Sequence, residues 1–280
     1  MPQECDPTAD QARRAQAFYA LHARPCAFII PNPWDVGTAR LLAAAGFEAL
    51  ATTSAGLAFT LGRRDGAVSR EETLANARAI AGATPLPVSA DLENGFGPDP
   101  ETVAETIRLA ASVGLVGGSI EDATGDGDAP IYDLSLAIER IAAAVEAARA
   151  LQFPFVLTAR AENFLHGRPD LDDTIRRLQA FEKAGADVLY APGLPSIAAI
   201  REVCSAVSRP VNVVAGLSGP TFTLQQLGDA GVKRVSVGSA LSRVALGAFM
   251  RGAREMKEAG SFVYAREAIP YTEINALMHP

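Results

Sequence analysis

The feature of this chain that most constrains its fold is a short unit in which a helix-like segment ends at glycine and an apolar run follows. The unit occurs four times, at residues 45–51, 113–119, 184–190 and 230–236. Glycine adopts the left-handed conformation that ends many helices without the steric cost of a Cβ atom. A chain that repeatedly ends a helix and begins a buried strand in this way is expected to be an alternating α/β protein.

Eight short apolar runs are predicted to be strands, and they alternate with segments rich in Ala, Arg and Glu that are typical of helices. Because the runs lack polar alternation, we expect parallel strands that are buried on both faces and covered by helices. The count favours a single (β/α)8 TIM barrel over residues 1–280, although a doubly wound open sheet would show a similar local pattern. The predicted strands are residues 27–30, 49–53, 87–91, 118–121, 155–159, 188–191, 211–214 and 234–237.

Composition and charge exclude several classes of protein. The 280 residues are 49% hydrophobic, which is enough for one large core. No apolar run is long enough to span a membrane and no signal peptide is apparent, so we expect a soluble, cytoplasmic protein. A net charge of −7 argues against a nucleic acid partner. The scattered cysteines Cys5, Cys26 and Cys204 lack the spacing of a disulfide framework or a zinc site.

Acidic side chains gather where a (β/α)8 barrel carries its active site, at the C-terminal ends of the strands and in the loops that follow. Asp91 and Glu93 follow the third predicted strand. Glu121 ends the fourth, and Asp65 lies in the loop after the second. These carboxylates would repel one another unless a hard cation or shared protons offset their charge, and oxygen ligands favour Mg²⁺, or Mn²⁺, over zinc. Any one of these acids could instead be a helix N-cap or the partner of a nearby arginine.

Arg160, at the end of the fifth predicted strand, offers a planar pair of donors that suits a substrate carboxylate. A salt bridge with Glu121 or Glu162 is the structural alternative. A cation together with this arginine suggests an anionic substrate that chelates metal, as a 2-oxo acid does through its carboxylate and keto oxygens. The lysines are predicted to lie away from the barrel mouth, which disfavours a Schiff-base aldolase. They are Lys183, Lys233 and Lys257.

The segments that follow the predicted strands also contain recognisable motifs. They are Pro31-Asn32-Pro33-Trp34-Asp35, Thr52 to Leu57, Leu61 to Asp65, Asp91 to Gly97, Ser119-Ile120-Glu121-Asp122 and Thr158-Ala159-Arg160. Through these motifs the chain resembles, over nearly its whole length, the isocitrate lyase and phosphoenolpyruvate mutase superfamily. The resemblance implies an Mg²⁺-dependent carbon–carbon lyase that acts on a small 2-oxo or 2-hydroxy di- or tricarboxylic acid. It also implies a homodimer or homotetramer whose C-terminal helix packs on, or is swapped with, a neighbouring subunit.

The resemblance further implies roles for individual residues. Asp91 would be the principal metal ligand, and the other acids would hold the ion mainly through water. The implied metal ligands are Asp65, Asp91, Glu93 and Glu121, and the residues expected to act in catalysis are Arg160, Glu121 and Asp65. Ser54 to Gly56 would form a loop whose backbone N–H groups cradle the 2-oxo acid. The expected substrate-binding residues are Thr53, Ser54, Ala55, Gly56, Arg160 and Asn212, although a structural hydrogen bond is an equal alternative for Asn212.

Three departures from the family pattern leave the reaction open. Glu93 stands in place of an aspartate, Gly193 in place of a glutamate, and residues 123–128 contain neither the Lys nor the Cys of the lyases' Lys-Lys-Cys-Gly loop. Cysteine-dependent cleavage of isocitrate or methylisocitrate, and formation of phosphonopyruvate, are therefore disfavoured. The candidates for the acid/base group are Tyr190, His166 and Glu162.

Three alternatives to a lyase remain. One is a hydrolase acting on oxaloacetate or a phosphonopyruvate-like compound on the same scaffold. Another is a catalytically silent 2-oxo acid-binding protein. The third is a phosphate-binding barrel enzyme that uses the glycine-containing segments 216–219 and 238–240.

Overall fold

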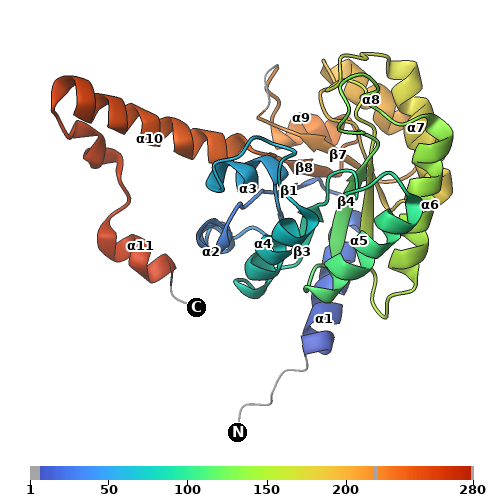
Figure 1. Ribbon diagram of the computed structural model, residues 1–280, viewed down its shortest axis with the longest axis horizontal. Helices are drawn as coiled ribbons and strands as arrows, with labels where there is room; N and C mark the ends of the chain where they lie inside the picture. The colour runs from blue at the N-terminus through green and yellow to red at the C-terminus, as the bar shows by residue number, and fades with distance from the viewer. Residues whose placement is uncertain (1–6, 217–219, 279–280) are drawn as a thin grey trace, which may run out of the picture.

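The computed structural model describes residues 7–216 and 220–278 of the chain. Within these ranges eight parallel strands, joined by helices, form a nearly closed barrel (Figure 1). Strand β1 pairs with β8, and from β8 down to β3 each strand pairs with the strand that precedes it in the sequence. The seam between β1 and β2 is bridged by the N–H of Ala51, which donates to the carbonyl oxygen of Pro31 at 3.1 Å. The barrel prediction is confirmed, since an open doubly wound sheet would not pair its first strand with its last.

All eight predicted strands are present, with bounds that differ from the prediction by at most two residues. They are β1 (Phe28–Ile30), β2 (Leu50–Ala51), β3 (Val88–Asp91), β4 (Gly117–Glu121), β5 (Val156–Arg160), β6 (Val188–Tyr190), β7 (Val211–Val214) and β8 (Arg234–Ser236). The helices that cover the barrel are α2 (Val36–Ala44), α3 (Ser54–Thr60), α4 (Arg70–Gly82), α5 (Pro100–Ser112), α6 (Leu134–Arg149), α7 (Leu171–Ala184), α8 (Ile197–Ala206) and α9 (Leu224–Asp229).

The four glycines of the repeated unit end their helices as expected. Gly46, Gly114, Gly185 and Gly231 have φ angles of 87°, 96°, 103° and 97°. Each lies in the left-handed region that a residue with a Cβ atom rarely adopts. The repeat therefore marks four of the points at which the chain leaves a helix and enters the barrel.

Helix α1 (Pro7–Ala23) closes the N-terminal end of the barrel. Its Ala15, Phe18 and Leu21 are buried in a cluster with residues from the beginnings of several strands, among them Phe28 and Val156. This helix was not among the predicted elements. Its apolar residues nevertheless recur at three-residue spacing, which is a helix signal.

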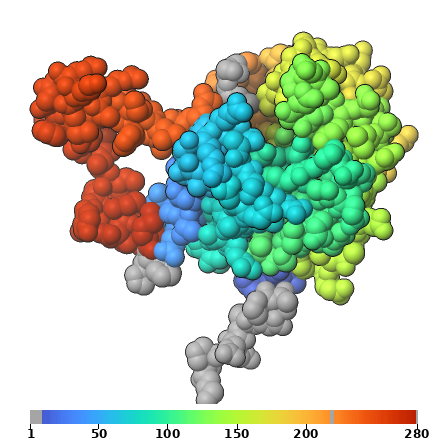
Figure 2. All heavy atoms as spheres, viewed as in Figure 1, coloured from blue at the N-terminus to red at the C-terminus, as the bar shows by residue number. Residues whose placement is uncertain are grey.

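The C-terminal segment forms an arm outside the barrel. Helix α10 (Ala240–Ala259) projects away from the strands, the 3₁₀ helix η1 (Val263–Glu267) turns the chain, and α11 (Tyr271–Leu277) returns to α2 (Figures 1 and 2). Arg40 of α2 donates a hydrogen bond to the carbonyl oxygen of Met278. Large apolar side chains of the arm are exposed, including Val244, Phe249, Met250, Phe262 and Tyr271. Among the described helices none is both long and apolar enough to cross a membrane.

Candidate active site

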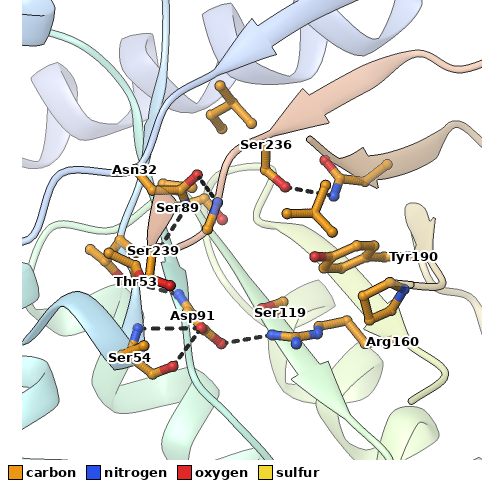
Figure 3. Close-up of a pocket in the computed structure, with 18 of the residues that line it drawn as sticks. Asn32, Thr53, Ser54, Ser89, Asp91, Ser119, Arg160, Tyr190, Ser236 and Ser239 are labelled. Carbon is orange, nitrogen blue, oxygen red and sulfur yellow. Dashed lines mark hydrogen bonds and ion pairs between the residues drawn. The ribbon is translucent and has the colours of Figure 1, made fainter. Parts of the chain in front are cut away.

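A small cavity opens at the C-terminal ends of the strands (Figure 3). Its volume is about 170 Å³, below the ~300–1,000 Å³ of pockets for drug-sized ligands, and this suits a small organic acid. Residues from all eight strands line it. The polar and loop residues in its lining include Asn32, Thr53, Ser54, Ala55, Asp65, Asp91, Arg160, Tyr190, Asn212, Arg234 and Ser236.

Asp91, the last residue of β3, links two predicted parts of the site. Its Oδ2 accepts hydrogen bonds from the backbone N–H and the hydroxyl of Ser54, at 3.3 and 3.0 Å. Its Oδ1 accepts from Nη1 of Arg160 at 2.9 Å (Figure 3). The predicted metal ligand, substrate loop and carboxylate-binding arginine therefore meet in one place.

Arg160 is held by three carboxylates. Its guanidinium lies 2.9 Å from Asp91, 3.1 Å from Glu121 and 2.9 Å from Glu162, and it stacks over the ring of Tyr190 at 4.9 Å. Burial disfavours the charged guanidinium, but the carboxylates of Glu162, Glu121 and Asp91 outweigh it and hold the pKa of Arg160 well above its usual value. The ion pairs with Glu121 and Glu162 were the structural alternative for this residue. They are present, yet Arg160 also lines the cavity.

Glu93 follows Asp91 in a strained loop. Its φ angle of 48° is uncommon for a residue other than glycine. Arg140 of α6 holds the same loop by donating to the backbone carbonyl oxygens of Asn94, Gly97 and Pro98. Oε1 of Glu93 is buried and has no hydrogen-bond partner among the described residues. Burial and then the charge of Asp91 raise the pKa of Glu93 to about 7.

The other two predicted acids lie differently. Asp65 lines the cavity, where desolvation and then the charge of Asp91 raise its pKa. Glu121 lies beside Arg160 and is not among the cavity-lining residues. Burial raises the pKa of Glu121 well above its usual range, against the opposing effect of Arg160.

The carboxylates do not form a compact cage. In residues 7–216 and 220–278 no group of three or more His, Cys, Asp or Glu side chains is close enough to surround a metal ion directly. Mg²⁺ commonly keeps several waters and takes one or two protein carboxylates. Asp91 and Asp65 at the cavity wall, with the partnerless oxygen of Glu93 nearby in sequence, suit a hydrated ion of that kind.

The predicted substrate loop is helical, which corrects the sequence-based interpretation. Ser54, Ala55 and Gly56 form the first turn of α3, and Thr53 is its N-cap, accepting a hydrogen bond from the N–H of Gly56 at 3.3 Å. A Cβ atom on Gly56 would lie 2.5 Å from Cγ2 of Thr53 and 2.9 Å from Cβ of Trp34. Glycine is therefore needed here for close packing against the motif after β1.

Asn32 of that same motif ties three strand ends together. Its Oδ1 accepts from the backbone N–H groups of Val237 and Gly238 at 2.8 and 3.0 Å, and its Nδ2 donates to the carbonyl oxygen of Thr52 at 2.9 Å. Asn32 belongs to the motif Pro31-Asn32-Pro33-Trp34-Asp35, which by itself predicts no role for its side chain. The structure shows that it holds the ends of β1, β2 and β8 in register.

The amide of Asn212 is engaged within the protein. Its Oδ1 accepts from Nε of Arg234 at 2.8 Å and its Nδ2 donates to Ser236 at 3.0 Å. Arg234 also donates to Thr158 at 2.9 Å and lies 3.3 Å from the imidazole of His22. Asn212 lines the cavity, but these contacts are the structural hydrogen bonds that were its alternative role.

Comparison with known proteins places the chain in a family. Residues 18–257 match the family model described as phosphoenolpyruvate phosphomutase. The chain belongs to the phosphoenolpyruvate phosphomutase family. The superfamily resemblance drawn from the strand-end motifs is thereby confirmed.

Three relatives show how this family member compares with others. A candidate lyase/mutase from Burkholderia cenocepacia J2315 is 62% identical, with a TM-score of 0.95 and 97% of each chain covered. The 2-methylisocitrate lyase of Escherichia coli K12 is 31% identical over 259 residues, covering 89% of this chain and 82% of the relative. The structure of phosphonopyruvate hydrolase in complex with oxalate and Mg²⁺ is 25% identical, with a TM-score of 0.84 and 94% of each chain covered.

Within this family fold, the three acid/base candidates differ in position. Tyr190 lines the cavity, whereas Glu162 is 2% exposed and paired with Arg160. His166 is not among the lining residues. Lys233 lies at the opposite end of the barrel, where its Nζ contacts the carbonyl oxygen of Pro25 at 3.1 Å, as expected.

The glycine segments considered for phosphate binding can be followed only in part. Gly238 and Ser239 line the cavity, and Gly216 is described. Residues 217–219 of the other segment lie outside the described residues. The phosphate-binding interpretation therefore stays a prediction.

Proposed function

We propose that this family member is an Mg²⁺-dependent carbon–carbon lyase. It cleaves a bond next to the carbonyl carbon of a small 2-oxo or 2-hydroxy di- or tricarboxylic acid, by a retro-aldol reaction or by decarboxylation. The observation that carries the proposal is the meeting of Asp91, Ser54 and Arg160 in one cavity of about 170 Å³. Support comes from the 31% identity to a 2-methylisocitrate lyase over most of both chains.

The donor set fits a divalent cation. Asp91 would hold it directly, and Asp65, Glu93 and Glu121 would hold its waters. The buried Oε1 of Glu93, which finds no donor in the described parts of the chain, is accounted for by such a water. When bound, Mg²⁺ or Mn²⁺ supplies Lewis-acid chemistry by stabilising the negative charge that develops on the oxygen of the 2-oxo group.

The protein's own groups bind and orient the substrate. Arg160 lines the cavity with a side chain that is 12% exposed, and it would offer N–H donors to a substrate carboxylate that displaces part of its contact with Asp91. The backbone N–H of Ser54 donates to Asp91 and Ala55 lines the cavity beside it, so the first turn of α3 would hold the anion close to Asp91. A substrate fixed at both points has its scissile bond aligned before reaction, and such positioning lowers the barrier to cleavage.

The test is release of 2-oxo acids from a panel of substrates. Oxaloacetate, 2-methylisocitrate, isocitrate, substituted malates and phosphonopyruvate are incubated with the protein and Mg²⁺, and parallel samples contain EDTA. We expect metal-dependent release of pyruvate or another 2-oxo acid from one of them. Absence of turnover across the panel, with 2-oxo acids still raising the melting temperature in the presence of Mg²⁺, would instead identify a silent binding protein.

A hydrolase is the second candidate. It is favoured by the similarity to phosphonopyruvate hydrolase over 94% of both chains. The absence of Lys and Cys from residues 123–128 also fits a reaction that does not need the lyases' loop motif. The same panel separates the two, because hydrolysis of oxaloacetate yields oxalate and acetate, whereas decarboxylation yields pyruvate and CO₂.

The C-terminal arm supports a homo-oligomer, either a dimer or a tetramer. Val244 of α10 is 67% exposed and Phe249 is 69% exposed, and clustered exposed apolar side chains mark protein interaction sites. We propose that α10 packs on, or is swapped with, a second copy of the chain. Light scattering should report an oligomer for the wild type and a smaller species for Phe249→Glu. A monomeric wild type would contradict the proposal.

A further inference from the structure

Tyr190 is a buried hydroxyl-bearing side chain that faces the cavity. It is the last residue of β6, is 9% exposed and lines the cavity wall. Its hydroxyl points into the cavity, and the guanidinium of Arg160 lies over the ring, 4.9 Å from the ring centroid (Figure 3). The ring is therefore fixed in place while its O–H group stays accessible to a bound molecule.

A chain of hydrogen bonds reaches the neighbourhood of this hydroxyl. Arg234 Nε donates to Asn212 Oδ1 at 2.8 Å, and Asn212 Nδ2 donates to Ser236 Oγ at 3.0 Å. Because Ser236 already accepts from the amide, its own hydroxyl hydrogen is free to point elsewhere. Asn212 is the register partner of both Tyr190 and Arg234, so the four side chains come from three adjacent strands.

The charges around Tyr190 suit a group that gives up a proton and takes it back. Burial raises the pKa of Tyr190, so the phenol is neutral at physiological pH, whereas Arg160 and the Ser236 hydroxyl favour its ionised form. Arg234 is a buried cation whose hydrogen bonds go to neutral side chains in the described residues. Its interaction with Tyr190 is attractive when the phenol is ionised.

The other candidate groups are less well placed. Glu162 Oε1 accepts from Nε of Arg160 at 2.9 Å, and its residue is 2% exposed. Neither His166 nor any residue of the segment 123–128 lines the cavity. Among Tyr190, His166 and Glu162, the tyrosine has the access that proton transfer to a bound substrate requires.

We propose that Tyr190 is the proton donor of the site and that Arg234, Asn212 and Ser236 are positioning residues that act through it. The inference rests on the proposed lyase function. Decarboxylation leaves an electron pair on the carbon next to the keto group, whereas retro-aldol cleavage leaves it on the carbon next to a carboxylate of the other fragment. In either case the Tyr190 O–H bond breaks as a new C–H bond forms at that carbon. The phenolate regains a proton from water. In a retro-aldol reaction the proton of the substrate hydroxyl passes to solvent, whereas decarboxylation takes up one proton overall.

The experiment uses the reverse of this step. For decarboxylation, pyruvate and 2-oxobutanoate are incubated with the full-length protein and Mg²⁺ in D₂O, and exchange of hydrogen at C3 is followed by NMR. For retro-aldol cleavage, exchange at C2 of succinate and propanoate is followed in the same way in the presence of pyruvate. In this direction the Tyr190 phenolate removes the proton and returns deuterium. Binding of oxalate is measured in parallel by calorimetry, as a readout that requires no turnover.

Tyr190→Phe should slow exchange by roughly 10²–10⁴-fold, the usual contribution of a general acid or base, with oxalate affinity unchanged. Tyr19→Phe makes the same chemical change at a side chain that is 51% exposed on α1, and should exchange like the wild type. Ser236→Ala should slow exchange by a smaller factor, and it serves as the test if Tyr190→Phe does not fold.

The outcomes separate the proposals. Wild-type exchange that survives in Tyr190→Phe would overturn the assignment of the proton donor alone. If Tyr190→Phe lost both proton exchange and oxalate binding, Tyr190 would be a substrate-binding residue, and its assignment as the proton donor would also be wrong. A wild type that neither exchanges protons nor releases 2-oxo acids from the substrate panel would overturn the proposed function, and this inference with it.

Discussion

Replacing Arg160 by lysine separates the two roles that its contacts suggest. Arg160→Ala would not do so, because it would leave the carboxylates of Asp91, Glu121 and Glu162 buried without their shared cation. Breaking a buried ion pair costs about 3–5 kcal/mol, a large part of a typical unfolding free energy of about 5–15 kcal/mol. Loss of binding in that variant would therefore follow from a disturbed fold under either role. Lysine keeps the positive charge and removes the planar fork.

The expected effect of Arg160→Lys follows from the lost donor geometry. One of the two charge-assisted hydrogen bonds to a substrate carboxylate disappears, which costs about 1.5–3 kcal/mol. At about 1.4 kcal/mol per tenfold change, the Kd for oxalate in the presence of Mg²⁺ should rise roughly 10- to 150-fold. Calorimetry measures the Kd, and a thermal melt measures the accompanying change in stability.

A matched variant controls for the general effect of the exchange. Arg149→Lys alters an arginine that pairs with Asp187 at 2.6 Å outside the cavity, so oxalate affinity should not change. If Arg160→Lys bound oxalate as tightly as the wild type and only its melting temperature fell, Arg160 would be a structural ion-pair residue. The proposed substrate-binding role would then be wrong.

Three further predictions concern other parts of the barrel. Asp91→Asn, which keeps the side-chain size, should abolish Mg²⁺-dependent activity and leave the far-UV spectrum unchanged; retained activity would refute the metal assignment. Burial and Arg234 lower the pKa of His22 to about 3. Between about pH 3 and pH 6.5 the imidazole is therefore protonated in the unfolded state and neutral in the folded state. The contribution of neutral His22 to the free energy of unfolding should be fully present above pH 6.5 and should be lost towards pH 3, by up to about 1.4 kcal/mol per pH unit. Urea titrations should find this pH dependence weakened in His22→Gln. Gly56→Ala should lose about 1–3 kcal/mol of stability, whereas Gly82→Ala, which meets no atom within 4 Å, should not.

The strand ends could be predicted, but the directions of their side chains could not. Glu121 and Asp122 are adjacent acids at the end of β4, and successive side chains of a strand point to opposite faces. Glu121 lies 3.1 Å from Arg160, while Asp122 lies 3.0 Å from Arg177 of α7. A shift of one residue in strand register would exchange these roles, and the pattern of residues within the segment does not predict the register.

The buried arginines were missed for a related reason. Arg140 holds the loop after β3 through backbone carbonyl oxygens, and Arg234 binds side chains from α1, β5 and β7. These partners are separated from the arginines by between 22 and 212 residues. Patterns within one segment reveal strands and motifs, but contacts of this kind depend on how distant segments meet.

The distribution of charge in the site also bears on how ligands bind. Asp65 and Asp91 line the cavity, where a cation would be held, and Arg160 is shared among three carboxylates. An anion that entered without a cation would meet repulsion and would compete with Asp91 for the guanidinium. A cation at Asp91 offsets both effects, so metal and substrate should each raise the affinity of the other, and by the same factor. An acidic patch with only a structural role would bind cations without this dependence on a 2-oxo acid.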